Sequence, residues 1–187
     1  LTFTKKQFGN HLKKDGPLTQ EGLPSLGNPK MLVIPINLRT KNATTTILKD
    51  VQTAFCGTSA ETGWESVESY YKKSSYGKLD LDCDVMQSWF TPKYSASYYN
   101  AYYDEYTGAN GSTLILREAL AYYESKLDLT EYDYDKDGCI DSVWLIYNCA
   151  VDYESDDSIY WAFMNWEYDD RKYDGVKAYN YAFAGTD

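Results

Sequence analysis

Two short runs of nearly continuous apolar residues predict strands that are covered on both faces. The first run is Met31 to Leu38 (MLVIPINL), and the second is Val143 to Val151. Uninterrupted apolar runs of this length are typical of strands in sheets that have helices on both faces. Pro35 has no backbone N–H, so we expect a bulge or an edge-side position at that point of the first strand.

Alternation of apolar and polar residues predicts further strands with one face in solvent. Leu79 to Val85 alternates apolar with acidic residues, and Val176 to Ala184 places Lys177 outward between apolar positions. Ile159 to Trp166 is also predicted to be a strand. The tyrosine-rich segment Thr91 to Thr107 is expected to be part helix and part loop.

Apolar residues at helical spacing predict three helices that are interleaved with these strands. The predicted helices are Thr45 to Phe55, Trp64 to Tyr71 and Leu116 to Leu127, and Ser112 is able to cap the start of the third. Helices interleaved with strands indicate an α/β or α+β domain, in which helices pack against a sheet in two or three layers.

The length of 187 residues allows one domain with a sizeable core, or one domain plus an extension. Residues 1–29 contain lysines, glycines and prolines without sustained periodicity, so they are expected to form an arm or linker. The domain is then residues 30–187. The only histidine, His11, lies in the arm and is expected to be an ordinary surface residue.

Charge and cysteine content restrict the partners and the covalent structure. A net charge of −10 argues against nucleic acid or an anionic membrane as the main partner, and no apolar run approaches the roughly 20 residues of a membrane span. If residues 141–151 form one strand, Cys139 and Cys149 lie about 30 Å apart, too far for a disulfide. Two disulfides would therefore require Cys56 and Cys83 each to pair with one of them.

The residues before the second apolar run form a candidate metal-binding loop. The loop, DYDKDGCID, has aspartates at relative positions one, three, five and nine and a glycine at position six. This spacing lets alternate side chains turn inward around one hard cation while the glycine makes the sharp turn. Closely spaced aspartates repel one another unless a cation neutralises them. The expected calcium ligands are the side chains of Asp133, Asp135, Asp137 and Asp141 and the carbonyl oxygen of Cys139.

The loop departs from an EF-hand at position twelve, where Trp144 replaces the bidentate glutamate and a strand replaces the exiting helix. We therefore expect a calcium loop that caps a strand and takes one or two ligands from elsewhere. The candidates for these ligands, each more simply explained as a solvated charge, are Asp152, Glu154, Asp156 and Asp157. The alternative for the whole loop is an acidic, solvated turn.

Five motifs follow one another along residues 30–187: MLVIPINL, SVESYYKKSSYGKLDL, DYDKDGCIDSVWLIYNCA, YWAFMNW and VKAYNYAFAG. In this order they resemble the immune inhibitor A family of secreted bacterial zinc metallopeptidases. The resemblance implies a zincin-like domain with a twisted mixed sheet, packed helices and a helix bearing HExxH, whose histidines hold zinc. It also implies a protein or peptide substrate, a secreted or cell-surface location and a structural role for the aspartate loop.

No HExxH occurs in the 187 residues, and one histidine cannot supply the ligands of a catalytic zinc. In the family the zinc helix follows a segment like VKAYNYAFAG, so we expect it after residue 187 and carry over no catalytic residue. The chain is then the N-terminal half of a catalytic domain, inactive alone; a diverged non-catalytic relative is the other possibility. Zincin-like folds bind the substrate along an edge strand, and Lys177 to Ala184 is either that edge or a central strand.

A different class of function also fits the sequence, namely a secreted, non-catalytic calcium-binding module that recognises glycans or proteins through surface aromatics. The chain has 20 tyrosines, with a dense group at Tyr98, Tyr99, Tyr102 and Tyr103. Planar rings stack on sugar faces, but tyrosines at this spacing more commonly pack one face of a helix. A third possibility is a structural or pro-region fragment without a partner of its own.

Overall fold

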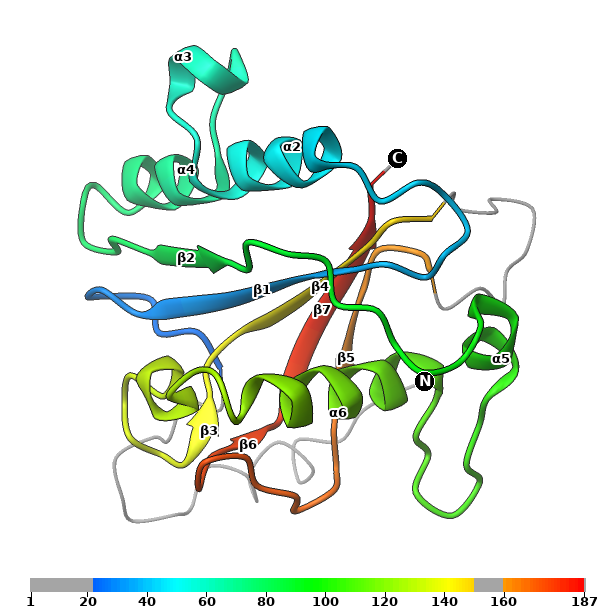
Figure 1. The fold of residues 1–187 in the computed structure, drawn as a ribbon. Helices are drawn as coiled ribbons and strands as arrows, with labels where there is room; N and C mark the ends of the chain where they lie inside the picture. Colours follow the sequence, from blue (N-terminus) through cyan, green and yellow to red (C-terminus); the bar gives the residue numbers. More distant parts are fainter. Residues whose placement is uncertain (1–21, 150–159, 187) are drawn as a thin grey trace, which may run out of the picture.

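The computed structural model describes residues 22–149 and 160–186. Its centre is a five-stranded mixed sheet with the strand order β2-β1-β4-β7-β5 (Figure 1). Four strands are parallel, and β5 is antiparallel to β7. The predicted architecture of a mixed sheet with packed helices is confirmed. The strands are β1 (Lys30–Ile36), β2 (Asp82–Val85), β4 (Val143–Tyr147), β5 (Phe163–Trp166) and β7 (Asn180–Gly185).

The two apolar runs of the sequence form β1 and β4, which pair with each other in the interior of the sheet. Residues 31–36 of β1 are all buried. The carbonyl of Pro35 accepts the N–H of Phe90 at 2.8 Å, on the side where β2 has already ended at Val85. The donor that proline lacks therefore faces a position beyond the end of β2, so no ladder bond between strands is lost.

Helices cover both faces of this sheet (Figure 1). On one face, α2 (Thr45–Cys56) and α4 (Val67–Ser74) pack over a core that includes Val33 of β1. On the other face, α6 (Gly111–Tyr123) packs over a core that includes Ile34. Successive side chains of one strand point to opposite faces, so β1 contributes to both cores.

The start of α6 differs from the prediction. Asn110 caps the helix, because its side-chain oxygen accepts the N–H groups of Ser112 and Thr113 at 3.0 and 3.2 Å. The predicted cap, Ser112, is instead a fully buried residue of the helix, and its hydroxyl lies 2.7 Å from the hydroxyl of Tyr181 on β7. Ser112 therefore belongs to the buried face of the helix and does not cap it.

The helix predicted from Trp64 to Tyr71 begins at Val67. Ser66 accepts the N–H of Ser69 through its side chain, and Ser69 accepts the N–H of Ser66 in return. This reciprocal capping fixes the helix start. Trp64 is left outside the helix, 80 % exposed, beside the short helix α3 (Ser59–Thr62).

The predicted strand Val176 to Ala184 is two strands in the structure. β6 (Lys177–Ala178) pairs with β3 (Cys139–Ile140) in a separate two-stranded sheet, and β7 begins after Tyr179. β7 is paired with β4 on one side and with β5 on the other. It is therefore a central strand, and the hypothesis that a substrate peptide adds to the edge of this segment is wrong.

Part of the predicted N-terminal arm contacts the domain. The N–H of Gly27 donates to the carbonyl of Lys78 at 2.8 Å, and the carbonyl of Pro29 accepts the N–H of Asp82 at 3.1 Å. His11 and the acidic residues 152–157 lie outside the described residues. Among residues 22–149 and 160–186, no helix combines the length and apolar character that crossing a bilayer requires.

Candidate metal site

The aspartate loop leads from the short 3₁₀ helix η1 (Leu129–Tyr132) into β3 and β4, next to β3 in Figure 1. Its backbone turns through two left-handed residues, Lys136 with φ +62° and Gly138 with φ +90°. Glycine is needed at the second, because a side chain is strained at this φ. The sharp turn expected at Gly138 is therefore present, and the loop caps a buried strand as predicted.

Three carboxylates of the loop converge. One oxygen from each of Asp133, Asp135 and Asp141 lies within 4.8 Å of the others. Asp133 and Asp141 are buried, with 4 % and 2 % of their surface exposed, whereas Asp135 is exposed. A cluster of three carboxylates, two of them buried, is unfavourable without a positive partner, since like charges repel and burial removes water from charged groups. A cation at this position would relieve both.

Asp141 has one oxygen without a partner. Its Oδ2 accepts the N–H of Tyr134 at 2.8 Å, but its Oδ1 is buried and has no hydrogen-bond partner. Burial, followed by the charges of the neighbouring loop aspartates, raises the pKa of Asp141 to about 7. A buried polar atom without a partner is costly in a folded protein. A metal ion bound to Oδ1 would supply the missing partner.

Asp133 and Asp135 also shape the loop itself. The Asp133 carboxylate accepts the N–H groups of Asp137 and Gly138, each at 3.1 Å, and Asp135 accepts the N–H of Asp137 at the same distance. Carboxylates that bind the backbone of their own loop hold the chain in a tight curve around them. The loop is therefore preformed around its three converging carboxylates.

Asp137 lies outside this three-carboxylate group. Its Oδ1 accepts the N–H of Cys139 at 2.8 Å, and burial raises its pKa. Cys139 is buried at the start of β3. The predicted metal ligands thus divide into three converging carboxylates and two residues, Asp137 and Cys139, whose roles as ligands remain predictions. The backbone bond of Asp137 is a turn interaction that ligand spacing alone does not predict.

The loop is fastened to the edge of the sheet through the residues on either side of it. The N–H of Asp141 donates to the carbonyl of Tyr132 at 2.8 Å, and the hydroxyl of Tyr132 donates to Asp84 of β2 at 2.6 Å. Glu131 pairs with Lys30 of β1 at 2.5 Å. A change in the conformation of the loop would therefore disturb its contacts with β1 and β2.

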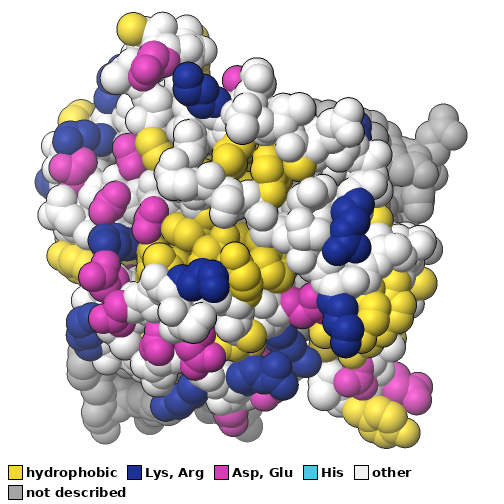
Figure 2. Space-filling view, in the orientation of Figure 1, with side chains coloured by type: hydrophobic (Ala, Val, Ile, Leu, Met, Phe, Trp, Pro, Cys, Tyr) yellow, Lys and Arg dark blue, Asp and Glu magenta, His cyan; other side chains and the backbone are white. Residues whose placement is uncertain are grey.

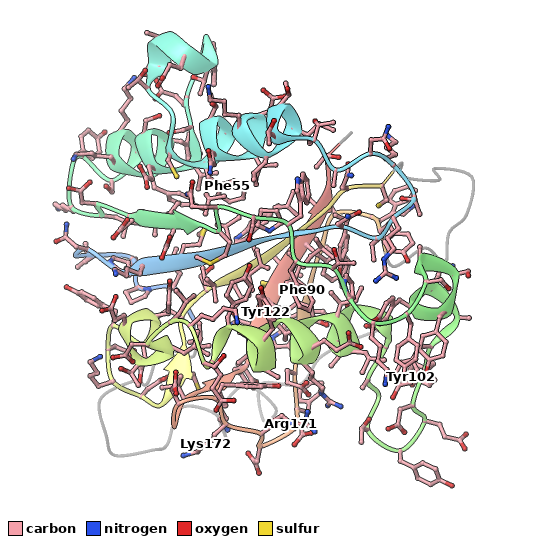
Figure 3. All side chains as sticks on the ribbon, in the orientation of Figure 1. Phe55, Phe90, Tyr102, Tyr122, Arg171 and Lys172 are labelled. Atoms are coloured by element: carbon pink, nitrogen blue, oxygen red, sulfur yellow. The ribbon has the colours of Figure 1, made fainter. Side chains whose placement is uncertain are left out.

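The predicted tyrosine group has mixed exposure. Tyr99, in the short helix α5 (Ala96–Ala101), is fully buried and donates its hydroxyl to Glu118 at 2.9 Å. Tyr98 is 42 % exposed and stacks on Tyr94, with ring centroids 4.2 Å apart. Hydrophobic side chains gather on the surface over α5 and the following loop (Figure 2), where Tyr102 is labelled in Figure 3. Both packing and an exposed aromatic surface are therefore present.

Comparison with models of known protein families finds no match to this chain, and a search of curated proteins finds no significant sequence match. The class of protein is therefore defined by the fold and the site alone. It is a mixed α/β protein with a preformed, mostly buried carboxylate cluster that could hold a metal ion.

Proposed function

We propose that the chain is the calcium-binding N-terminal half of the catalytic domain of a secreted zinc metallopeptidase, with the zinc-binding helix after residue 187. The observation that carries the calcium site is the buried, unpartnered oxygen of Asp141 beside Asp133 and Asp135. The peptidase part is supported by the mixed sheet and by the motifs that resemble the immune inhibitor A family.

Calcium suits the donors of this site better than zinc or magnesium. The converging groups are all carboxylates, which are the hard oxygen donors that calcium prefers, whereas zinc is held mainly by cysteine and histidine. Calcium takes about six to eight oxygens in flexible geometry. Three carboxylates therefore leave positions for Asp137, for the carbonyl of Cys139 and for water. Magnesium demands a stricter octahedron and keeps more of its own water.

Calorimetric titration of the metal-free chain tests the calcium site. We expect one calcium site, much weaker binding of magnesium, and at least a roughly tenfold loss of calcium affinity in Asp141→Asn, because one charged ligand is removed. Asp50→Asn is the matched control, since Asp50 is exposed on α2, which packs against a different core from Ile140 of the loop. Absence of calcium binding, or equal losses in both variants, would contradict the proposal.

The antiparallel strand β5 is the place where this sheet could accept a substrate peptide. In the described part of the chain it pairs with β7 alone, and its Phe163 and Met164 are 63 % and 49 % exposed. The N–H of Glu167 donates to the carbonyl of Tyr179, the residue just before β7. The backbone N–H and C=O groups of the odd-numbered residues of β5 therefore face β7, and those of Met164 face away. An extended peptide could add to this free backbone.

An apolar groove beside the end of β7 supports the proposal that a helix follows this strand. It has a volume of about 480 Å³ and lies between α2 and the sheet, with Phe55, Trp144, Ile146 and Ala184 in its lining. Phe55 points from α2 toward the sheet (Figure 3) and contacts Trp144 edge-on, with ring centroids 5.6 Å apart. Gly185 and Thr186 line the same groove, so a helix that follows β7 could bury this apolar surface.

The peptidase proposal is tested on a longer protein that includes the residues encoded after Asp187. We expect it to cleave an unfolded protein such as casein with zinc bound, and to lose activity when zinc is removed. Met164→Pro should raise KM strongly with little change in melting temperature, because it removes an N–H that faces away from β7. A downstream sequence without paired histidines, or a zinc-loaded protein that cleaves nothing, would contradict the proposal.

The exposed stack of Tyr94 and Tyr98 favours the second candidate function, recognition of glycans or proteins by a non-catalytic module. The two candidates differ in where activity resides. A binding module should retain its ligand in the present 187-residue chain, and Tyr98→Ala should abolish that binding. A peptidase half needs the downstream residues, and its activity should be insensitive to Tyr98→Ala.

A further inference from the structure

Two cysteines meet where α2 ends over the edge strand β2. Cys56 is the last residue of α2, and its Sγ lies 3.0 Å from the backbone carbonyl oxygen of Cys83. The Cys83 side chain points into the core beneath α2, with its Sγ 3.9 Å from the Sδ of Met31. Cys56 is exposed and Cys83 is 5 % exposed. The accessible thiol of Cys56 thus contacts the backbone of Cys83, whose own thiol is buried.

The other two cysteines lie in different parts of the fold from this pair. Cys149 belongs to the core on the α6 face, whereas Cys83 belongs to the core on the α2 face. Cys139 lies in β3, which pairs with β6 outside the main sheet. A disulfide requires Cα atoms within roughly 7 Å and converging side chains. Cys56 and Cys83 are in direct contact on one face of the sheet, so they are the pair from which a disulfide can be argued.

We propose that Cys56 and Cys83 are a disulfide site, closed by exchange with a low-molecular-weight disulfide such as oxidised glutathione. The exposed Cys56 thiolate attacks one sulfur of the glutathione disulfide and releases one glutathione thiolate. The Cys83 thiolate then attacks the Sγ of Cys56 and releases the second. Two protein thiols are oxidised to one disulfide, one glutathione disulfide is reduced to two thiols, and the two protein protons pass to solvent or to the released thiolates.

The bond would close a loop that contains α3 and α4. Residues 57–82 connect the end of α2 to β2, and this segment includes the exposed Trp64. Cross-linking a loop of this size stabilises a protein chiefly by restricting its unfolded state. Burial raises the pKa of Cys56 to about 12, with the carboxylate of Glu68 contributing. Thiolates are therefore scarce at neutral pH and exchange should be slow without an oxidoreductase.

The test is thiol titration and peptide mapping of the chain after prolonged incubation with oxidised glutathione at pH 8.5. We expect the number of titratable thiols in denaturant to fall from four to two, with one cross-linked peptide joining Cys56 to Cys83. The melting temperature should rise by about 5–10 °C and return to its starting value with dithiothreitol.

Matched variants make the result specific to this pair. After incubation with oxidised glutathione, the number of titratable thiols in Cys149→Ser should still fall by two, and its melting temperature should rise by the same amount. Cys56→Ser should show neither change. Four remaining thiols would overturn the proposal. So would a persistent glutathione adduct on Cys56, or a cross-link that involves Cys139 or Cys149. None of these results depends on calcium or on peptidase activity, so the outcome is independent of the proposed function.

Discussion

Replacement of Asp141 by asparagine should stabilise the metal-free chain, and calcium should reduce that gain. In the metal-free chain, burial and the nearby aspartates raise the pKa of Asp141 from 3.8 to about 7. Keeping this carboxylate ionised at pH 8 therefore costs roughly 4 kcal/mol relative to the unfolded chain. Asparagine still accepts the N–H of Tyr134 but carries no charge. We expect a net gain of about 1–3 kcal/mol, since the new amide hydrogens need acceptors of their own.

Calcium should shift the balance between the two proteins toward the parent chain. A ligand at 100 times its Kd stabilises the folded state by about 2.7 kcal/mol, whereas a variant that binds ten times more weakly gains about 1.4 kcal/mol at the same concentration. Calcium should therefore remove at least about 1.3 kcal/mol of the advantage of Asp141→Asn. The assay is urea unfolding at pH 8, followed by tryptophan fluorescence, in chelator and in saturating calcium, with Asp50→Asn as the control. If Asp141→Asn lowers the free energy of unfolding equally in both conditions, Asp141 is an ordinary structural hydrogen-bond acceptor and not a metal ligand.

The same carboxylate gives the metal-free chain a defined pH dependence. Its folded-state pKa is raised, so the stability gained from its protonation is fully present below about pH 4 and is lost as pH rises through about 7. The free energy of unfolding of the metal-free chain should therefore fall over this range relative to Asp141→Asn. Calcium should bind more tightly over the same range, because it binds the ionised carboxylate. Parallel pH profiles for the two proteins would contradict this assignment.

Two further predictions concern contacts away from the metal. Arg117→Met should lower the free energy of unfolding by about 3 kcal/mol, because it leaves the buried Glu167 carboxylate without the guanidinium that binds both its oxygens at 2.6 and 2.9 Å. Adding Glu167→Gln should restore most of this loss, as measured by urea unfolding. No recovery in the double variant would contradict the pairing. Gly27→Ala should destabilise more than Gly77→Ala by about 1 kcal/mol, because both have positive φ but only the first places a Cβ against the Tyr134 hydroxyl. Equal melting temperatures for the two alanine variants would exclude a tight contact between the loop and the arm.

Local patterns predicted those parts of the fold in which one physical requirement dominates. The run from Met31 to Leu38 has no polar face to turn outward, and it became the buried strand β1. The helix predicted at Thr45 to Phe55 has its apolar residues on one side, and Leu48, Val51 and Phe55 are buried in α2. The metal loop belongs to the same group, because aspartate spacing and Gly138 determine its curve locally.

Long-range contacts decided the features that the patterns missed. Alternation in Val176 to Ala184 indicates a strand but does not say how many neighbours it has, and β7 has two. Ser112 and Asn110 are both good caps, and the choice between them depended on Tyr181, which is distant in sequence. The contact of Cys56 with Cys83 likewise depends on how the end of α2 sits over β2. None of these partners is encoded in the local spacing.

An anomalous difference map from crystals grown with calcium would locate the ion itself. We expect one strong peak at the N-terminal end of β4, in contact with the carboxylates of Asp133, Asp135 and Asp141, and no such peak in Asp141→Asn. A calcium-soaked crystal in which this loop holds only water, with the oxygens of Asp141 bound to protein groups alone, would contradict the calcium site.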